Sequence, residues 1–173
     1  MKSSGSVAER SWLRTALKKA SLAVAASFIF VSLAHAEHFR SSQTISIEAN
    51  NASLSKNANE PQKVKGGLTA KGAGIFQSGS NQQEVVVVTL ITHFQGTPTQ
   101  LVNTQTAILS FGDGSTIRFE SDGKANGKRG TYKIMTSQGT GRFKGIKATG
   151  VVRGTAFDPS LSYVFMEGDF DLP

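Results

Sequence analysis

Short segments rich in β-branched residues, separated by glycine-containing turns, make up most of the chain after residue 40. The strongest segment is residues 84–94, where valine, threonine and isoleucine dominate. Asp113-Gly114 and Asn126-Gly127 lie between such segments, and these dipeptides adopt the positive φ that tight hairpin turns require. No segment after residue 36 has a sustained helical period of 3.6 residues. The chain is therefore expected to fold as an all-β sandwich or barrel.

The expected strands are short and follow one another at nearly regular spacing. Loops are expected at residues 49–62, where polar residues dominate, and at residues 121–127. Abundant glycine suits the bends and bulges by which strands curve into a barrel. The expected strands cover residues 44–48, 63–70, 75–76, 84–94, 105–111, 115–120, 130–136, 146–157 and 161–170.

The first 36 residues have the three parts of an export signal. Five basic residues and one acidic residue precede an apolar run of about 14 residues, which ends at Ala34-His35-Ala36. The run is shorter than the roughly 20 residues that a membrane-spanning helix needs. We therefore expect cleavage of this signal peptide after Ala36, a periplasmic or secreted location, and no transmembrane segment in the mature chain. Residues 37–173 are expected to form a single β-barrel domain.

Composition excludes several classes of function. The chain has no cysteine, which rules out cysteine nucleophiles, thiolate metal sites and iron–sulfur clusters. His38 and His93 are the only histidines after the signal, so no metal site is expected, and no cofactor motif is present. Residues 37–173 keep 14 basic and 11 acidic residues, a net charge of +3. This charge is ordinary for a soluble protein, and no nucleic-acid partner is expected.

Positive charge is nevertheless concentrated in residues 124–153, which contain no acidic residue. Two interpretations are open. The segment is either a solvated barrel face with lysines that protect strand edges, or a basic patch for an anionic partner. The basic residues of this segment are Lys124, Lys128, Arg129, Lys133, Arg142, Lys144, Lys147 and Arg153.

The most specific motif is Gly139-Thr-Gly141, followed by Phe143 and Gly145. The glycines are expected to form a tight turn and to permit close approach of the backbone. Phe143 is expected to plug one end of a barrel. A phosphate-binding role is not expected, because a glycine-rich phosphate loop leads into a helix, whereas a strand is expected here.

This motif resembles the hallmark of the allene oxide cyclase and dirigent superfamily. Gly114-Ser-Thr-Ile117 is similar to the dirigent Gly-Ser-Thr-Leu segment, and the resemblance covers residues 84–171. It implies an antiparallel eight-stranded calycin-like barrel with an internal apolar cavity, and a homo-oligomer that is a dimer or a trimer. The family's catalytic residues do not carry over, since the cysteine of plant allene oxide cyclases is absent and no positions match the dirigent aspartates and arginine.

Candidate site residues follow from alternation, because successive residues of a barrel strand face inward and outward. Tyr163, Phe165 and Glu167 share one face of the last expected strand. If this face is inward, the two aromatic residues bind the ligand and Glu167 is a desolvated acid or base. If it is outward, which we favour, Glu167 is solvated. His93 is a second candidate acid or base, or a structural histidine. Arg118 is a further candidate ligand-binding residue, or half of a surface ion pair.

Three functions compete on these observations. The favoured one is an exported barrel that binds or guides a small hydrophobic or anionic molecule. The second is a cofactor-independent cyclase or isomerase of the same fold. The third is an interaction protein that acts through the basic segment. The first is favoured because the sequence has no Gly-x-Ser-x-Gly elbow and no other recognisable catalytic machinery.

Overall fold

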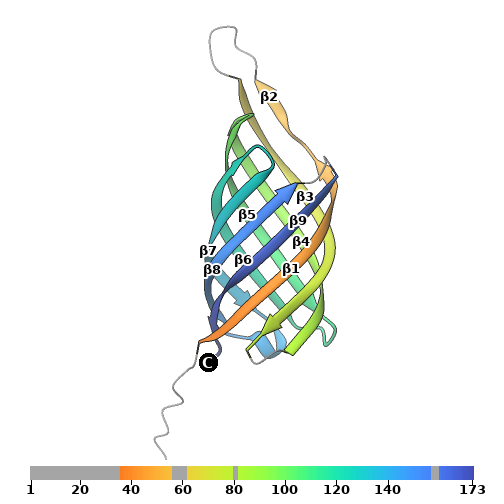
Figure 1. The fold of residues 1–173 in the computed structure, drawn as a ribbon, viewed down its shortest axis with the longest axis vertical. Coiled ribbons are helices and arrows are strands. Elements are labelled where there is room, and N and C mark those ends of the chain that lie inside the picture. The colour runs from red at the N-terminus through yellow and green to blue at the C-terminus, as the bar shows by residue number, and fades with distance from the viewer. Residues whose placement is uncertain (1–35, 56–61, 80–81, 157–159) are drawn as a thin grey trace, which may run out of the picture. The chain divides into compact units, whose positions relative to one another are not determined.

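The computed structural model describes residues 36–55, 62–79, 82–156 and 160–173. Besides strands, this part of the chain contains one turn of 3-10 helix, η1 (Gly141–Phe143). No helix within it is long and apolar enough to span a bilayer. The strands are β1 (Glu37–Asn50), β2 (Ser53–Ser55), β3 (Lys63–Ser78), β4 (Gln82–Thr97), β5 (Gln100–Phe111), β6 (Thr116–Asn126), β7 (Arg129–Gly139), β8 (Lys147–Ala156) and β9 (Leu161–Asp171) (Figure 1).

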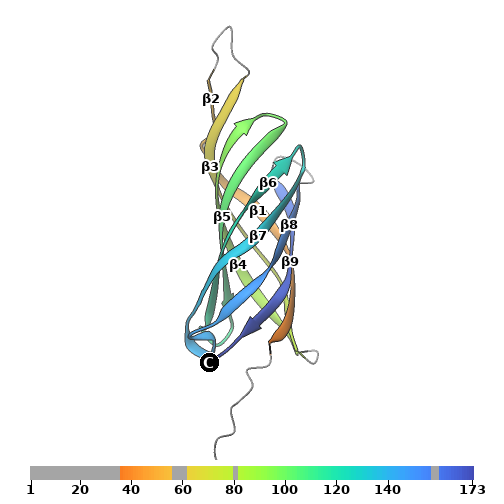
Figure 2. The same cartoon turned by 90° about the vertical axis from the view of Figure 1, so that its left-hand side faces the viewer.

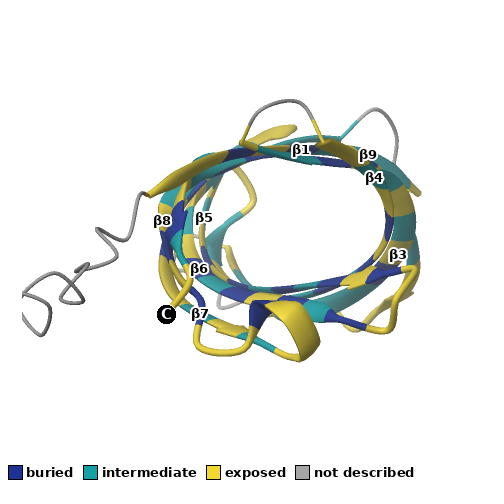
Figure 3. Cartoon of the chain, turned by 90° about the horizontal axis from the view of Figure 1, so that it is seen from below, coloured by how far each residue is buried: buried dark blue, intermediate teal, exposed yellow. Residues whose placement is uncertain are grey.

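Eight of these strands close into an antiparallel barrel. Strands β3 to β9 pair in chain order, and β1 pairs with β9 on one side and with β3 on the other. The short strand β2 pairs with the first residues of β3, Lys63–Lys65, next to the part of β3 that pairs with β1. Seen along its axis, the barrel is a closed ring of strands (Figure 3). The expectation of an all-β, eight-stranded antiparallel barrel is confirmed, and closure removes the exposed strand edges of an open sheet.

Several strands are longer than expected from the sequence. The loop expected at residues 121–127 is wrong, because β6 continues to Asn126 and only the turn before Arg129 remains. Residues 63–70 and 75–76 join in the single strand β3. Within the polar stretch of residues 49–62, β2 pairs with β3, and residues 56–61 lie outside the described part. In a closed barrel each strand pairs on both sides, and this pairing keeps in the strand even residues whose own strand propensity is weak.

Side chains along the strands point alternately into the barrel and out of it, with the expected period of two. In β4, Val86 and Val88 are buried, whereas Val85 and Val87 are exposed. In β9, Val164, Met166 and Phe170 are buried. The core of the protein is therefore the inside of the barrel.

Phenylalanine rings fill the end of the barrel that holds η1 and the C-terminus. In Figures 1 and 2 this is the lower end of the barrel. Neighbouring ring centroids in this aromatic plug lie between 4.7 and 6.5 Å apart. Edge-to-face and offset stacked geometries both occur, as expected for favourable aromatic contacts. The plug consists of Phe39, Phe76, Phe111, Phe119, Phe143 and Phe170.

Candidate functional site

A cavity opens at the end of the barrel opposite the aromatic plug. Its volume is about 250 Å³, and its rim includes the turn between β6 and β7. We call this cavity the cup. Side chains from β1, β3, β4, β5, β8 and β9 make most of its wall apolar. Examples are Ile47, Leu68, Leu90, Leu101, Val152 and Val164.

One side of the cup is polar. Thr92 of β4, Asn103 and Gln105 of β5, and Tyr132 of β7 point into it, and we call these four residues the polar wall. All four are buried. Asn103 Nδ2 donates a hydrogen bond of 3.1 Å to the Tyr132 hydroxyl, which also shares a hydrogen bond with Gln105. The cup thus combines an apolar surface with a small set of buried polar groups, the usual composition of a ligand pocket.

Glycines make the space for this arrangement. A Cβ atom at Gly130 would lie 2.0 Å from the Tyr132 hydroxyl oxygen, and one at Gly123 would lie 2.6 Å from Tyr132 Cα. The tyrosine side chain therefore occupies the room that two missing side chains leave. Gly154 of β8 also lines the cup, and a Cβ atom there would meet nothing within 4 Å. Gly154 faces open space inside the cup.

The buried Tyr132 hydroxyl is expected to make the folded barrel less stable at alkaline pH. Burial raises the pKa of Tyr132 above 10.0, and the hydrogen bonds with Asn103 and Gln105 offset part of this rise. The folded barrel therefore binds the phenolic proton more tightly than the unfolded chain does. This contribution is complete below about pH 10 and is lost as the pH rises through the folded-state pKa.

We expect the free energy of unfolding of the wild-type protein to fall more steeply between about pH 9 and about pH 11 than that of Tyr132→Phe. Urea unfolding followed by circular dichroism at both pH values measures the difference. Equal losses in the two proteins would contradict a neutral, buried Tyr132.

The basic residues of segment 124–153 do not form one patch. Lys128 and Arg129 lie at the rim of the cup. Arg142 belongs to η1, and Lys144 and Lys147 follow it at the plugged end. The length of the barrel separates these two groups. Lys124, Lys133 and Arg153 lie on the outer surface of β6, β7 and β8 between them.

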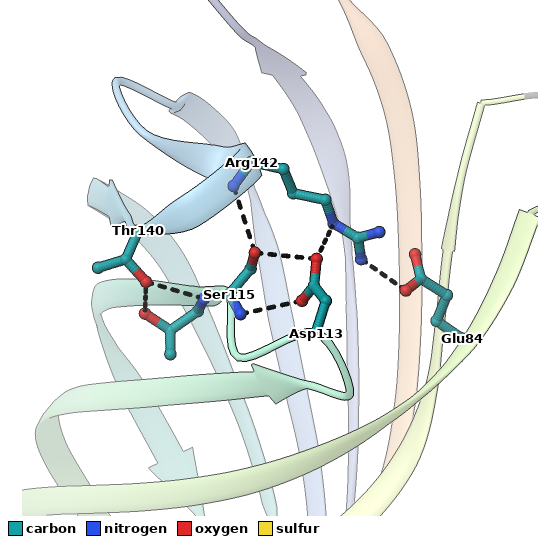
Figure 4. A network of polar contacts seen from close by, with 6 residues as sticks. Glu84, Asp113, Ser115, Thr140 and Arg142 are labelled. Carbon is teal, nitrogen blue, oxygen red and sulfur yellow. Dashed lines mark hydrogen bonds and ion pairs between the residues drawn. The ribbon is translucent and has the colours of Figure 1, made fainter.

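The Gly-Thr-Gly-x-Phe motif lies at the plugged end. Hydrogen bonds join it, in the connection between β7 and β8, to the turn between β5 and β6 (Figure 4). Ser115 Oγ accepts a hydrogen bond of 3.2 Å from the Arg142 backbone N–H and donates one of 3.0 Å to Asp113. The Arg142 guanidinium also donates a hydrogen bond to Glu84. Gly141 has a φ of +58°, and a Cβ there would lie 2.3 Å from Ser115 Oγ. These contacts hold the plugged end and take no part in the cup.

The guanidinium of Arg142 also covers the aromatic plug. Its Cζ atom lies 5.0 Å from the ring centroid of Phe111 and 4.8 Å from that of Phe143. Both distances are within the range of a cation–π contact. Phe143 is 5% exposed and contacts the rings of Phe76, Phe111 and Phe170. The motif therefore places a ring inside the barrel end and a cation over it.

The candidate residues of the last strand lie outside the barrel. Tyr163, Phe165 and Glu167 alternate with the buried Val164 and Met166 in β9. A ligand in the cup would therefore touch none of the three.

Glu167 pairs with Arg153 on this outer surface. The hydrogen bond from Arg153 is the largest influence on the carboxyl group and holds its pKa below the usual 4.5. Glu167 is therefore an ionised carboxylate of a surface ion pair, which does not suit a general acid.

The other two candidates also lie on the outer surface. His93 is an exposed residue of β4 and flanks the buried Thr92. The Arg118 guanidinium donates a hydrogen bond of 2.7 Å to Glu120, and both side chains are more than 40% exposed. Such a surface pair contributes little to stability. Neither residue lines the cup.

Sequence reasoning missed the polar wall. Asn103 lies before residue 105, where we expected the strand to begin, so its inward position was not assigned. The available signal was the alternation of Asn103, Gln105, Ala107 and Leu109 on one face of β5. Two amides on the same face as core residues indicate a polar side to the interior.

No protein-family model matches the chain, and none of the curated proteins matches it significantly. Among the described residues, no group of three or more histidine, aspartate or glutamate side chains is placed to hold a metal ion.

Proposed function

We propose that this protein is an exported barrel that binds or guides a small, mainly apolar molecule in the cup. The observation that carries the proposal is the uneven filling of one barrel. Six phenylalanines pack its lower end, whereas the upper end keeps a cavity of about 250 Å³. Protein interiors normally leave few voids larger than a water molecule. A cavity that opens to solvent and is lined by apolar side chains is therefore best explained by a ligand.

The basic residues at the rim of the cup favour a ligand that carries an anionic group. Lys128 and Arg129 lie at the mouth, next to the apolar wall. Positive charge at the entrance of a low-dielectric cavity raises the local concentration of anions. A small molecule with an apolar body and a negative group near the mouth fits both features.

Export is part of the proposal. The run of basic and apolar residues before Ala36 supports a signal peptide cleaved after Ala36, and a periplasmic or secreted barrel. Within the described part of the chain, the first strand begins at Glu37. Removal of residues 1–36 therefore leaves every strand of the barrel intact.

The resemblance to the allene oxide cyclase and dirigent superfamily, with its calycin-like barrel, stays a proposal. The closed eight-stranded barrel and its apolar cup support it. Assembly into a dimer or trimer belongs to the same proposal, and native mass spectrometry would report it.

Binding or guiding fits the cup better than acid–base catalysis. A cyclase or isomerase that moves a proton needs an acid or base facing its substrate. Of the described residues that line the cup, only Tyr132, Lys128 and Arg129 are ionisable. The pKa of Tyr132 is raised, which suits a neutral hydrogen-bonding group, and the two cations lie at the rim.

Filling the cup tests this function. The variant Gly154→Phe places a ring in the open space that Gly154 faces, without a backbone clash. Gly112→Phe is the matched control, because Gly112 also has open space around it but lies in the turn at the plugged end. The probe is 2-naphthol, and isothermal titration calorimetry measures its affinity for protein purified as the host cell produces it.

We expect the wild-type protein and Gly112→Phe to bind 2-naphthol equally. Gly154→Phe is expected to bind it at least about tenfold more weakly, a loss of about 1.4 kcal/mol. Equal affinity in all three proteins would place the probe outside the cup and contradict the proposal. Native mass spectrometry of the wild-type protein, compared with its denatured mass, would reveal a ligand that survives purification.

A further inference from the structure

We infer that the ligand of the cup carries a neutral hydroxyl group, which pairs with Asn103 and Thr92 on the polar wall. This inference rests on the proposed function, because it names the chemistry of a molecule in the same cavity. It is carried by two buried polar atoms that have no hydrogen-bond partner among the described residues.

The first of these atoms is the side-chain oxygen of Asn103. Asn103 is 6% exposed, and its amide nitrogen already donates a hydrogen bond to the Tyr132 hydroxyl. This bond leaves Oδ1 without a donor. Leaving such a buried acceptor unpaired destabilises the fold, and nearly all buried polar atoms in native proteins have a partner. The wall therefore offers an acceptor to a donor that comes from outside the chain.

The second atom is the hydroxyl oxygen of Thr92, which has no hydrogen-bond partner among the described residues. Thr92 as a residue is 3% exposed. Thr92 pairs across the strands with Gln105, and Phe94 pairs with Asn103. Thr92 and Asn103 are thus diagonal neighbours on the inner face of β4 and β5. Such neighbours lie roughly 7–8 Å apart, so that one group placed between their side chains can contact both.

A hydroxyl group matches these two atoms better than a carboxylate does. It donates one hydrogen bond, to Asn103 Oδ1, and accepts another from the Thr92 hydroxyl. A carboxylate only accepts hydrogen bonds and would face the Asn103 oxygen with like polarity. It would also have no cation beside it, because Lys128 and Arg129, the cations that line the cup, are at its rim. An ionised group buried without a partner is strongly disfavoured.

The size of the cup limits the rest of the molecule. Its volume of about 250 Å³ lies just below the range of roughly 300–1,000 Å³ that is usual for ligand pockets. The buried part of the ligand is therefore compact and apolar. We assign to the cup a small alcohol or phenol, with any anionic group directed to the mouth.

Matched pairs of probes that differ by a hydroxyl and a methyl group test the inference. The pairs are 2-naphthol with 2-methylnaphthalene and p-cresol with p-xylene. Calorimetry or competition titration measures both affinities of each pair. We expect the wild-type protein to prefer the hydroxyl compound by at least about tenfold, the contribution of about one hydrogen bond to a buried group.

Two variants assign this preference to the wall. Thr92→Val keeps the shape of the side chain and removes the hydroxyl, and Asn103→Leu removes the free acceptor. Each is expected to reduce the hydroxyl preference by about threefold or more. Thr92→Val should melt no lower than the wild type, because the hydroxyl it removes is unpaired. The control is Thr104→Val, which removes an exposed hydroxyl from the outer face of the same strand as Asn103.

The outcomes separate this inference from the proposed function. Binding of both members of a pair with equal affinity would overturn the hydroxyl inference and leave the cup as a binding site. A preference that persists unchanged in Thr92→Val and Asn103→Leu would place the hydroxyl elsewhere and overturn it too. If neither member of either pair binds the wild-type protein, the proposed function fails and the inference fails with it.

Discussion

Phe39→Ala is expected to lower the free energy of unfolding by about 3–5 kcal/mol, the usual cost of deleting a buried ring. Phe39 is 0% exposed and lies at the centre of the aromatic plug. Its ring centroid is 5.8 Å from that of Phe76, 5.5 Å from that of Phe119 and 6.1 Å from that of Phe170. Removal of this ring leaves a cavity that rings from three other strands line.

Rigid surroundings make the cost of this change high. The closed hydrogen-bonded wall prevents the strands from moving inward to fill the space, and the penalty grows with the cavity that remains. Domains of this size are typically stable by only about 5–15 kcal/mol, so the loss is a large fraction of the total.

Guanidinium chloride unfolding followed by circular dichroism measures this loss. The control is Val85→Ala, because Val85 is 69% exposed and its truncation should change stability by no more than about 0.5 kcal/mol. A loss below about 1 kcal/mol for Phe39→Ala would mean that the plugged end is not packed as described.

Gly72→Ala is expected to disrupt the pairing between β1 and β3. A Cβ atom at Gly72 would lie 1.9 Å from the Thr44 carbonyl oxygen and 2.7 Å from Ile45 Cα. Both of these are backbone atoms of β1, so no side chain can rotate away to relieve the clash. The pairing of β1 with β3 closes the barrel. We expect a loss of about 1–3 kcal/mol or more, because overpacking against backbone forces the strands apart.

The matched control for this change is Gly154→Ala. It makes the same substitution in another strand of the barrel, where the added Cβ meets nothing within 4 Å. That variant should be as stable as the wild type, or more stable by about 0.4–1 kcal/mol, because alanine restricts the unfolded chain. Equal unfolding free energies for Gly72→Ala and Gly154→Ala would contradict the close approach of β1 and β3.

The expected strands and the all-β class were accessible from local patterns, whereas the eight-stranded barrel was what the family resemblance implied. The β-branched run of β4 and the Asp-Gly and Asn-Gly turns are properties of neighbouring residues, and they predict strands without knowledge of the partners. The extent of β6 was not accessible in this way. Asp122, Gly123 and Asn126 are weak strand formers, yet pairing with β5 and β7 keeps them in the sheet.

Which face of the last strand points into the barrel could not be predicted from the sequence either. Alternation showed that Tyr163, Phe165 and Glu167 share a face, but both orientations satisfied the pattern. Each face of β9 carries an aromatic residue, so hydrophobicity alone could not choose between them. The packing of Met166 and Phe170 into the barrel decided the question.

By itself, the sequence determined the strand-rich composition, the Asp-Gly and Asn-Gly turns, the absence of cysteine chemistry and the export-signal pattern, because each depends on neighbouring residues or on counts. Only the tertiary structure decided which end of the barrel is filled and which is hollow. The plug gathers phenylalanines from five strands and η1. The cup depends on Thr92, Asn103 and Tyr132 meeting across strands, and on glycines that leave room between them. Such arrangements arise from register and closure, which bring together residues that are distant in the chain.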